Sequence, residues 1–153
     1  AVPLYEQLEL LKKNMVAVVC GILSGTLASL GGIFALCTLF GFNHQQYVTM
    51  LPKSITTAIG IGISEELGGI VTITVAVIII TGILGNVIAD TVFHIFKIKN
   101  PLAKGLALGT ASHAIGTARA IEMGPVEGAM SSLAVAVAGL LTVIFVSGFA
   151  QLI

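Results

Sequence analysis

The sequence has very little charge. Only 9% of its 153 residues are charged, whereas a soluble domain carries about a quarter. Hydrophobic residues make up 56%, and the mean hydropathy is +1.07. The scarcity of charge excludes an ordinary soluble domain and indicates an integral membrane protein. Basic and acidic residues number seven each and form no basic run, which excludes a nucleic-acid-binding surface.

Cysteine and recognisable catalytic motifs are also scarce. Cys20 and Cys37, the only two cysteines, lie in one apolar segment, and a helix there would hold them about 25 Å apart. They cannot pair with each other, and no CxxC or similar metal-ligand spacing is present. The sequence contains no recognisable nucleophile–base pair or phosphate loop. These absences predict a protein that is not an enzyme and holds no cofactor or metal.

Apolar segments, by contrast, fill the chain. Residues 15–42, 70–96 and 126–153 are each long enough to span a bilayer, which takes about 20 residues. Two shorter apolar segments, residues 48–63 and 102–121, lie between them. Backbone polar groups in lipid need internal partners, so all five segments are expected to be helical. The predicted fold is an all-α polytopic transmembrane helical bundle with two broken or re-entrant helices, in a single membrane domain over residues 1–153.

An apolar segment interrupted by glycine, hydroxyl-bearing residues and a glutamate occurs twice, at an offset of 56 residues. T-T-A-I-G at residues 56–60 leads to Glu66, and S-H-A-I-G at residues 112–116 leads to Glu122. Interrupted hydrophobic segments at matching places in two halves are typical of a transporter's central site. We therefore expect repeat-like halves over about residues 15–96 and 70–153. We expect the chain to break deep in the membrane near each of the two glutamates.

The lysines indicate how the halves are oriented. Lys12 and Lys13 precede the first span, and Lys97, Lys99 and Lys104 surround a later loop. Placing both clusters on the cytoplasmic side satisfies the positive-inside rule. The two short segments then enter the membrane from opposite sides, which makes the repeat an inverted one. If both short segments spanned fully, the second cluster would lie outside.

Four kinds of charged or titratable residue are candidates for chemistry in or beside the short segments. Arg119, the only arginine, predicts either a fork for a substrate carboxylate or an ion pair with Glu122, three residues further on. Glu66 and Glu122 predict either binding of a coupling proton or cation, or capping of the helices that follow them. His113 predicts either a proton carrier or a hydrogen-bonded packing residue. Lys53, at the mouth of the first segment, either steers anions or extends to the lipid headgroups, and the second is the default.

Hydroxyl and small side chains complete the candidate set. Thr110 adds a hydroxyl near the second interruption, and the hydroxyls expected to reach a substrate are those of Thr56, Thr57, Ser112 and Thr117. Such groups either surround a bound carboxylate or bond back to their own helix. Together with Arg119 and His113 they form the predicted substrate-binding set. Small residues also recur at Gly105, Gly109, Ser112 and Gly116, which predicts close packing of another helix.

Several of these residues carry a family resemblance. The runs K-G-L-A-L-G-T-A-S-H-A-I-G-T-A-R-A at residues 104–120 and L-P-K-S-I-T-T at residues 51–57 resemble the LrgB/CidB family. The run E-G-A-M-S-S-L-A at residues 127–134 is also similar. The family commonly has proline where Ala58 stands here. Its members are longer at the N-terminus, so this chain is expected to be the C-terminal part of a longer one.

The resemblance implies two functions. Bacterial members are described as antiholin-like modulators of murein hydrolase activity and cell lysis, with a small holin-like membrane partner of the LrgA/CidA type. Relatives, including the plastid glycolate/glycerate translocator and bacterial partners in pyruvate uptake, move small carboxylates. We expect a transporter of small monocarboxylates in the bacterial inner membrane. The alternative is an antiholin-like modulator that acts through helix association. The expected partners are the lipid bilayer, a small carboxylate, the holin-like protein and, in a homo-oligomer, further copies of the chain.

Overall fold

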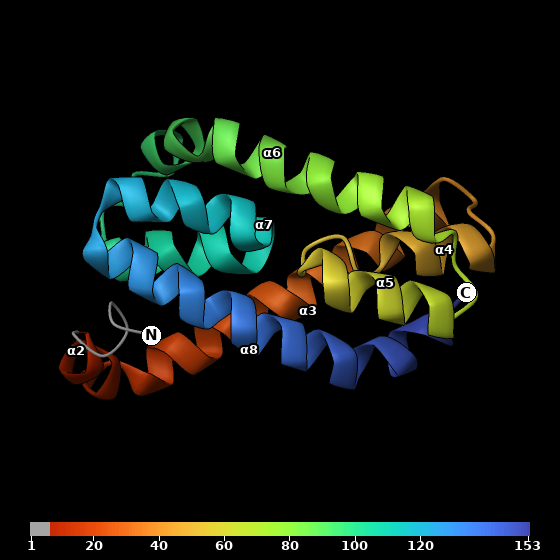
Figure 1. The fold of residues 1–153 in the computed structure, drawn as a ribbon, viewed down its shortest axis with the longest axis horizontal. Helices are drawn as coiled ribbons and strands as arrows, with labels where there is room; N and C mark the ends of the chain where they lie inside the picture. The colour runs from red at the N-terminus through yellow and green to blue at the C-terminus, as the bar shows by residue number, and fades with distance from the viewer. Residues whose placement is uncertain (1–6) are drawn as a thin grey trace.

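The computed structural model describes residues 7–153, and every element of regular structure in that range is a helix. In chain order the helices are α2 (Leu8–Lys13), α3 (Met15–Leu39), α4 (His44–Met50), α5 (Thr57–Glu66), α6 (Val71–Ile95), α7 (Pro101–Met123) and α8 (Pro125–Ala150). The helices α3, α6 and α8 are long and apolar enough to cross a membrane, and they run along the long axis of the molecule (Figure 1). The chain is therefore an all-α polytopic membrane protein, as its composition predicts.

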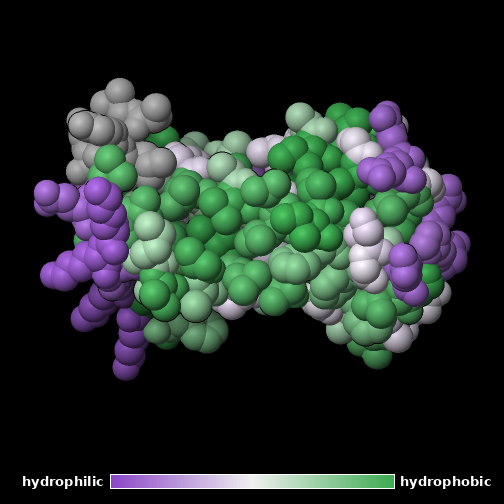
Figure 2. All heavy atoms as spheres, turned by 90° about the horizontal axis from the view of Figure 1, so that it is seen from below, coloured by the Kyte–Doolittle hydropathy of each residue, from purple (hydrophilic) through white to green (hydrophobic). Residues whose placement is uncertain are grey.

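The two ends of the molecule carry most of the polar surface. Figure 2 shows hydrophilic side chains at both ends and a broad hydrophobic surface between them. Leu11 of α2 and Leu102 of α7 pack against the same buried cluster, so the start of α3 and the loop between α6 and α7 lie at one end. Both lysine clusters of the sequence belong to these segments. We call this the lysine-rich end; its location on the cytoplasmic side stays a prediction of the positive-inside rule.

Helix α7 is a re-entrant hairpin. His113 has φ 43° and ψ −135°, which breaks the helix into an outward arm, residues 101–112, and a return arm, residues 114–123. A Cβ atom on Gly116 would lie 2.7 Å from the carbonyl oxygen of Leu108. Eight residues along a continuous helix would separate these positions by about 12 Å. The return arm therefore folds back on the outward arm. The hairpin as a whole begins and ends at the lysine-rich end (Figure 1).

Another hairpin, which comes earlier in the chain, enters from the opposite end. It consists of α4, a turn at residues 51–56, and α5. Asn43 begins α4 with a capping box, in which Asn43 and Gln46 each accept a hydrogen bond from the other's backbone amide. The Oγ1 atom of Thr74 in α6 donates to the carbonyl of Thr49 and contacts the hydroxyl of Ser64, at 2.9 and 2.8 Å, and so links the two arms. We call this unit the first hairpin and α7 the second hairpin.

The two hairpins and their preceding helices form the inverted repeat that the sequence predicts. Helices α3 and α6 begin 56 residues apart and also end 56 residues apart. Thr57 begins the return arm α5, and its counterpart at the same offset is His113, where the second return arm begins. Figure 1 shows the two hairpins entering from opposite ends and meeting near the middle of the molecule. The doubled sequence pattern therefore marks the two return arms.

The expected depth of the breaks at Glu66 and Glu122 is wrong. Glu66 is the last residue of α5 and Glu122 lies one residue before the end of α7, and both are exposed, at opposite ends of the molecule. The chain reverses inside the membrane earlier, at residues 51–56 and at His113. Each return arm then carries its glutamate out to the surface, where water solvates the carboxylate at no desolvation cost.

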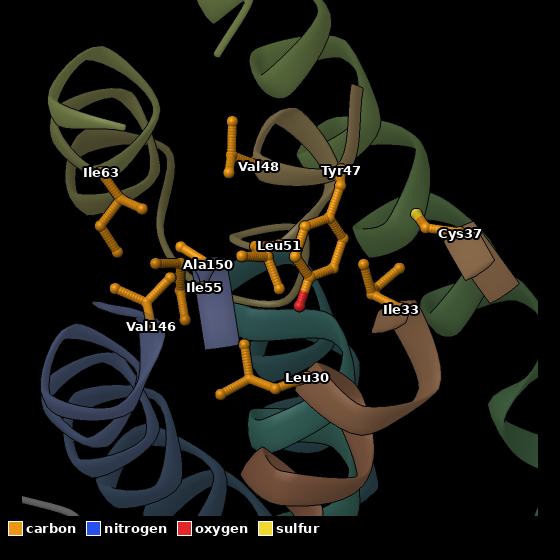
Figure 3. Packing of buried hydrophobic residues seen from close by; sticks show 10 residues of the cluster. All are labelled: Leu30, Ile33, Cys37, Tyr47, Val48, Leu51, Ile55, Ile63, Val146 and Ala150. Atoms are coloured by element: carbon orange, nitrogen blue, oxygen red, sulfur yellow. The ribbon is translucent and has the colours of Figure 1, made fainter. Parts of the chain in front are cut away.

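An apolar cluster fixes the first hairpin between α3 and α8. Tyr47, Leu51 and Ile55 of the hairpin pack with Leu30 of α3 and Val146 of α8, all nearly inaccessible to solvent (Figure 3). The hydroxyl group of Tyr47 donates a 2.8 Å hydrogen bond to the carbonyl of Phe149. The cluster therefore holds the turn of the first hairpin inside the molecule. The hydrogen bond to Phe149 satisfies the buried hydroxyl of Tyr47.

Candidate functional site

The two hairpins meet on α6 at Ile78. The carbonyl oxygen of Ile78 accepts a 2.9 Å hydrogen bond from Nε2 of His113, at the tip of the second hairpin. On the other side, the Ile78 side chain contacts Gly60 of the first hairpin so closely that any Cβ there would collide with it. One residue of α6 thus contacts the tip of the second hairpin and the return arm of the first.

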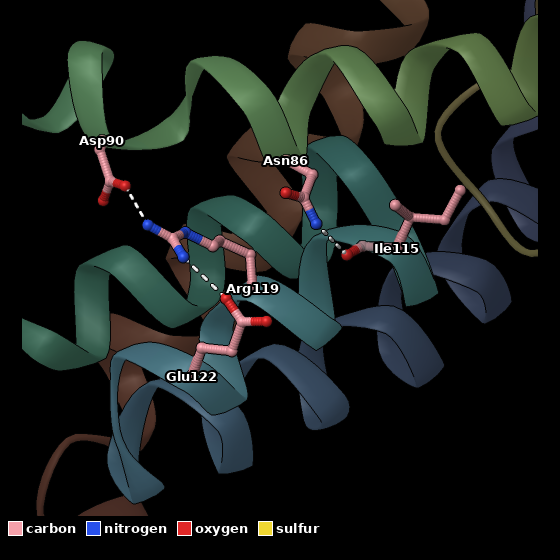
Figure 4. Close-up of polar contacts among 5 residues, drawn as sticks. All are labelled: Asn86, Asp90, Ile115, Arg119 and Glu122. Atoms are coloured by element: carbon pink, nitrogen blue, oxygen red, sulfur yellow. Dashed lines mark hydrogen bonds and ion pairs between the residues drawn. The ribbon is translucent and has the colours of Figure 1, made fainter.

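The tip of the second hairpin is closely packed. His113 is 3% exposed, and a Cβ on Gly82 of α6 would lie 2.8 Å from its ring. Ser112 is also buried, and its hydroxyl occupies the space that a Cβ on Gly85 would need. Asn86 donates a 3.2 Å hydrogen bond to the carbonyl of Ile115, a backbone group near the break (Figure 4). Because α6 presents glycine or asparagine at these positions, the non-helical backbone of the tip is packed and satisfied inside the protein.

The predicted hydroxyl groups lie at both tips. Thr117 donates a 2.9 Å hydrogen bond to the carbonyl of His113 and contacts the hydroxyl of Ser131 at 2.8 Å, so it holds the second tip to α8. Thr56 is the N-cap residue of α5, but its side chain does not cap the helix, and Thr57 follows as the first helical residue. Both threonines are half-buried. The structure therefore places all three near the breaks but gives a bonding role within the protein only to Thr117.

Arg119 lies away from the tips, in an ionic network near the lysine-rich end. Its guanidinium group binds Asp90 of α6 and also Glu122, the latter at 2.7 Å (Figure 4). The side chains of Arg119, Asp90 and Glu122 are 33%, 62% and 66% exposed. The ion pair with Glu122 is one of the two alternatives that the sequence leaves open, and Asp90 adds a second carboxylate. This network ties the second return arm to α6.

Because the network is exposed, we expect it to contribute little to stability. Replacement Arg119→Gln should lower the midpoint of thermal unfolding only slightly, and the loss should shrink when salt screens the charges. The measurement is thermal unfolding of the purified protein in detergent at low and high ionic strength. Lys99→Gln, at an exposed lysine of the same end, is the matched control. A large loss that is the same at both salt concentrations would contradict this expectation.

The glycine stripe of the second hairpin faces the protein's own helices. A Cβ on Gly105 would lie 2.5 Å from the backbone carbonyl of Glu127, and one on Gly109 would collide with that of Ser131, both in α8. Gly116 lies instead against the outward arm of its own hairpin. The stripe therefore lets three helical segments approach closely, and α8 covers Gly105 and Gly109.

Lys53 is more enclosed than its position in the sequence predicts. The structure places it in the turn of the first hairpin, inside the molecule, where Nζ lies 2.7 Å from the hydroxyl of Ser54 and 3.4 Å from that of Ser29. The capping box that begins at Asn43 was the available signal, because it predicts a helix immediately before this turn. Without that helix, Lys53 falls at the mouth of a span, where lysine ordinarily extends to the headgroups.

A cavity of about 850 Å³ lies beside Lys53. Its lining comes from α3, from the turn of the first hairpin and from the outward arm of the second. The polar lining residues are Ser24, Ser29, Lys53, Ser54, Asn100 and Thr110. Most of the rest are alanine and glycine, and small side chains leave the space between the helices open. The cavity therefore borders both hairpins.

Two further findings limit the chemistry of the site. Over residues 7–153, no three or more His, Cys, Asp or Glu side chains come together in a way that could hold a metal ion. Cys20 and Cys37 are both free thiols, one exposed and the other buried. The groups that the site offers to a ligand are an ammonium, hydroxyls and backbone amides, which suit binding of an anion.

A family model described as LrgB-like matches residues 1–152. The chain belongs to the LrgB-like family. This confirms the resemblance that rests on residues 51–57, 104–120 and 127–134. No solved structure matches the chain.

Two curated relatives of this LrgB-like chain carry the same name. The antiholin-like protein LrgB of Bacillus subtilis (strain 168) is 40% identical over 153 residues, which is 100% of this chain and 66% of the relative. The antiholin-like protein LrgB of Bacillus cereus (strain B4264) is 41% identical over 149 residues, which is 97% of this chain and 65% of the relative. The chain thus spans slightly less than two thirds of the length of these relatives.

Proposed function

We propose that the protein is a carrier for small monocarboxylates of the pyruvate, glycolate or glycerate type in the bacterial cell membrane. The observation that supports this most is the meeting of two hairpins, one from each end, beside a common cavity. Non-helical backbone at membrane depth is tolerated where it is buried in protein or lines a cavity. In inverted-repeat transporters, the substrate site lies at such broken helices near the midplane.

The carboxylate would bind in this cavity, beside the turn of the first hairpin. The side chain of Thr56 leaves the first amide groups of α5 uncapped, and a helix N-terminus favours an anion. His113 is the group at the tips that can carry a coupling proton, on Nδ1, because Nε2 donates to Ile78. The exposed Glu66 and the ion-paired Arg119 and Glu122 lie outside this proposed site.

Uptake into proteoliposomes tests the carrier proposal. The full-length protein, reconstituted into liposomes, is expected to accumulate radiolabelled pyruvate, glycolate or glycerate with saturable kinetics, and unlabelled substrate should compete. Protein-free liposomes and labelled sulfate are the controls. Uptake should be measured with and without an imposed pH gradient, since His113 would couple transport to protons. Rates equal to those of protein-free liposomes for all three substrates, under both conditions, would reject the proposal.

A second candidate function is antiholin-like control of lysis, supported by the name of the Bacillus relatives. Association with a holin-like partner would need a surface other than the glycine stripe, because α8 covers Gly105 and Gly109. The outward side of α6 offers one, since Leu84 and Val87 are 55% and 71% exposed. A Leu84→Ser/Val87→Ser double variant should then lose control of murein hydrolase activity in cells and retain uptake. Unchanged lysis control in that variant would remove this surface from the candidate function.

A further inference from the structure

Lys53 is a cation inside the membrane domain with no carboxylate partner in residues 7–153. Both ion pairs in that part of the chain belong to Arg119. Lys53 itself is half-buried, in a turn whose neighbours Leu51, Pro52 and Ser54 are buried. A charged group at membrane depth is costly, and such groups generally pair with another charge or mark a substrate pathway.

The hydrogen bonds around Lys53 leave donors free. The Ser29 hydroxyl donates to Ser54 at 3.0 Å, and Ser54 also accepts from Lys53. The proton of the Ser54 hydroxyl has no acceptor among the described contacts. An ammonium group has three N–H donors, and the two serines use at most two of them. At least one N–H and one O–H therefore remain for a ligand that only accepts hydrogen bonds, as a carboxylate does.

The cavity gives a small ligand access to these donors. Lys53, Ser29 and Ser54 line it at the depth of the first turn, and Asn100 and Ala17 line it at the lysine-rich end. Its volume, about 850 Å³, lies within the range of small-molecule sites, roughly 300–1,000 Å³.

We propose that Lys53, with the hydroxyls of Ser29 and Ser54, is the carboxylate-binding site of this protein, and that it is entered from the lysine-rich end. This deepens the carrier proposal and rests on it for the role of the site, although binding can be measured without transport. One carboxylate would accept from the Lys53 ammonium and from the Ser54 hydroxyl. The alanine and glycine lining would contact the short carbon chain of the substrate, which selects for small molecules.

The site uses the first hairpin for charge, where the sequence pointed to the second. Arg119 of the second hairpin is already bound to two carboxylates, so its charge is neutralised within the protein. The position that matches Lys53 in the second hairpin is Gly109, which packs against α8. The two hairpins therefore have a similar backbone arrangement and different roles. The first binds the anion through Lys53, and the second packs against α6 and α8.

Direct binding of radiolabelled pyruvate to the purified full-length protein in detergent tests the site. Wild-type protein should bind pyruvate, and the uncharged pyruvamide should not compete. Lys53→Gln is expected to weaken binding about tenfold or more, because a charge-assisted pair is lost. Lys53→Arg should retain much of it. Ser54→Ala should weaken it severalfold, and Lys12→Gln, the same charge change at an exposed lysine of the lysine-rich end, should leave it unchanged.

The outcomes separate the site from the carrier function. Lys53-dependent binding without uptake into proteoliposomes would support the site and reject the carrier. Uptake that is unchanged in Lys53→Gln would support the carrier and overturn the site. If Lys53→Gln does not elute as folded protein, Ser54→Ala and Lys53→Arg decide, and normal binding in Ser54→Ala overturns the proposal. A ligand-independent loss of stability in Lys53→Gln, with pyruvate binding intact, would also overturn it, because the lysine would then be paired within the protein.

Discussion

Gly109→Val is expected to prevent the second hairpin from packing against α8. At Gly109 any Cβ collides with the backbone carbonyl of Ser131 and lies 2.7 Å from the Cβ of Ala134. A backbone atom cannot move aside as a flexible side chain can, so the two helices must separate. Overpacking of this kind costs about 1–3 kcal/mol for a small side chain and more for a branched one. We expect Gly109→Ala to lower the unfolding midpoint by several degrees and Gly109→Val to abolish recovery of folded protein.

The matched control for Gly109 is a helical glycine with open space around it. A Cβ on Gly32 of α3 meets nothing within 4 Å. Gly32→Ala should therefore be neutral or stabilising, by up to about 1 kcal/mol of helix propensity. Each variant is compared with the unchanged protein by thermal unfolding in the same detergent, monitored by far-UV circular dichroism. Equal effects of Gly32→Ala and Gly109→Ala would show that the hairpin does not depend on close approach to α8.

His113 should also be costly to replace, and two variants separate the causes. Its φ of 43° is unfavourable for any residue with a Cβ, by about 1–3 kcal/mol, and glycine avoids this strain. Its Nε2 donor anchors the tip to Ile78. His113→Ala keeps the strain and loses the anchor, and we expect it to cost about 2–4 kcal/mol. His113→Gly should lose the same anchor but recover about 1 kcal/mol of strain.

Denaturant unfolding of the three proteins in mixed micelles measures the difference. His94→Ala, at an exposed histidine near the end of α6, is the control and should be close to neutral. If His113→Gly proves less stable than His113→Ala, the backbone at position 113 is not strained, and the anchor alone fixes the tip.

The repeat was readable from the sequence because its two copies share both spacing and chemistry. The offset of 56 residues, with lysines at one side of the membrane, was enough to predict an all-α inverted repeat with two interrupted helices. Thr57 and His113 do begin the two return arms. What sequence could not supply was the depth of each interruption. Glu66 looks equally plausible at the midplane or at the surface until the length of the arm before it is known.

The candidate site shows the same limit. Arg119 and Lys53 are each rare cations in apolar sequence, and their spacing does not tell which of them has a partner. Asp90, which neutralises Arg119, lies 29 residues away in the sequence, and folding alone brings it close. Ser29, beside Lys53, is similarly remote. The contrast between a paired arginine and an unpaired lysine is therefore a property of the tertiary structure.

The position of α6 between the hairpins has a consequence for biosynthesis. Neither return arm is long enough to span the bilayer, since α5 has 10 residues and about 20 are needed. Each hairpin has buried polar groups whose hydrogen-bond partners lie in α6. For the second hairpin, Ile78 and Asn86 are already synthesised when His113 and Ile115 emerge. For the first, Thr74 is made after both arms, so Thr49 and Ser64 wait for their partner. The first hairpin, which carries Lys53, must therefore wait after its own synthesis for its contacts with α6. The second hairpin can form its contacts as soon as it is made.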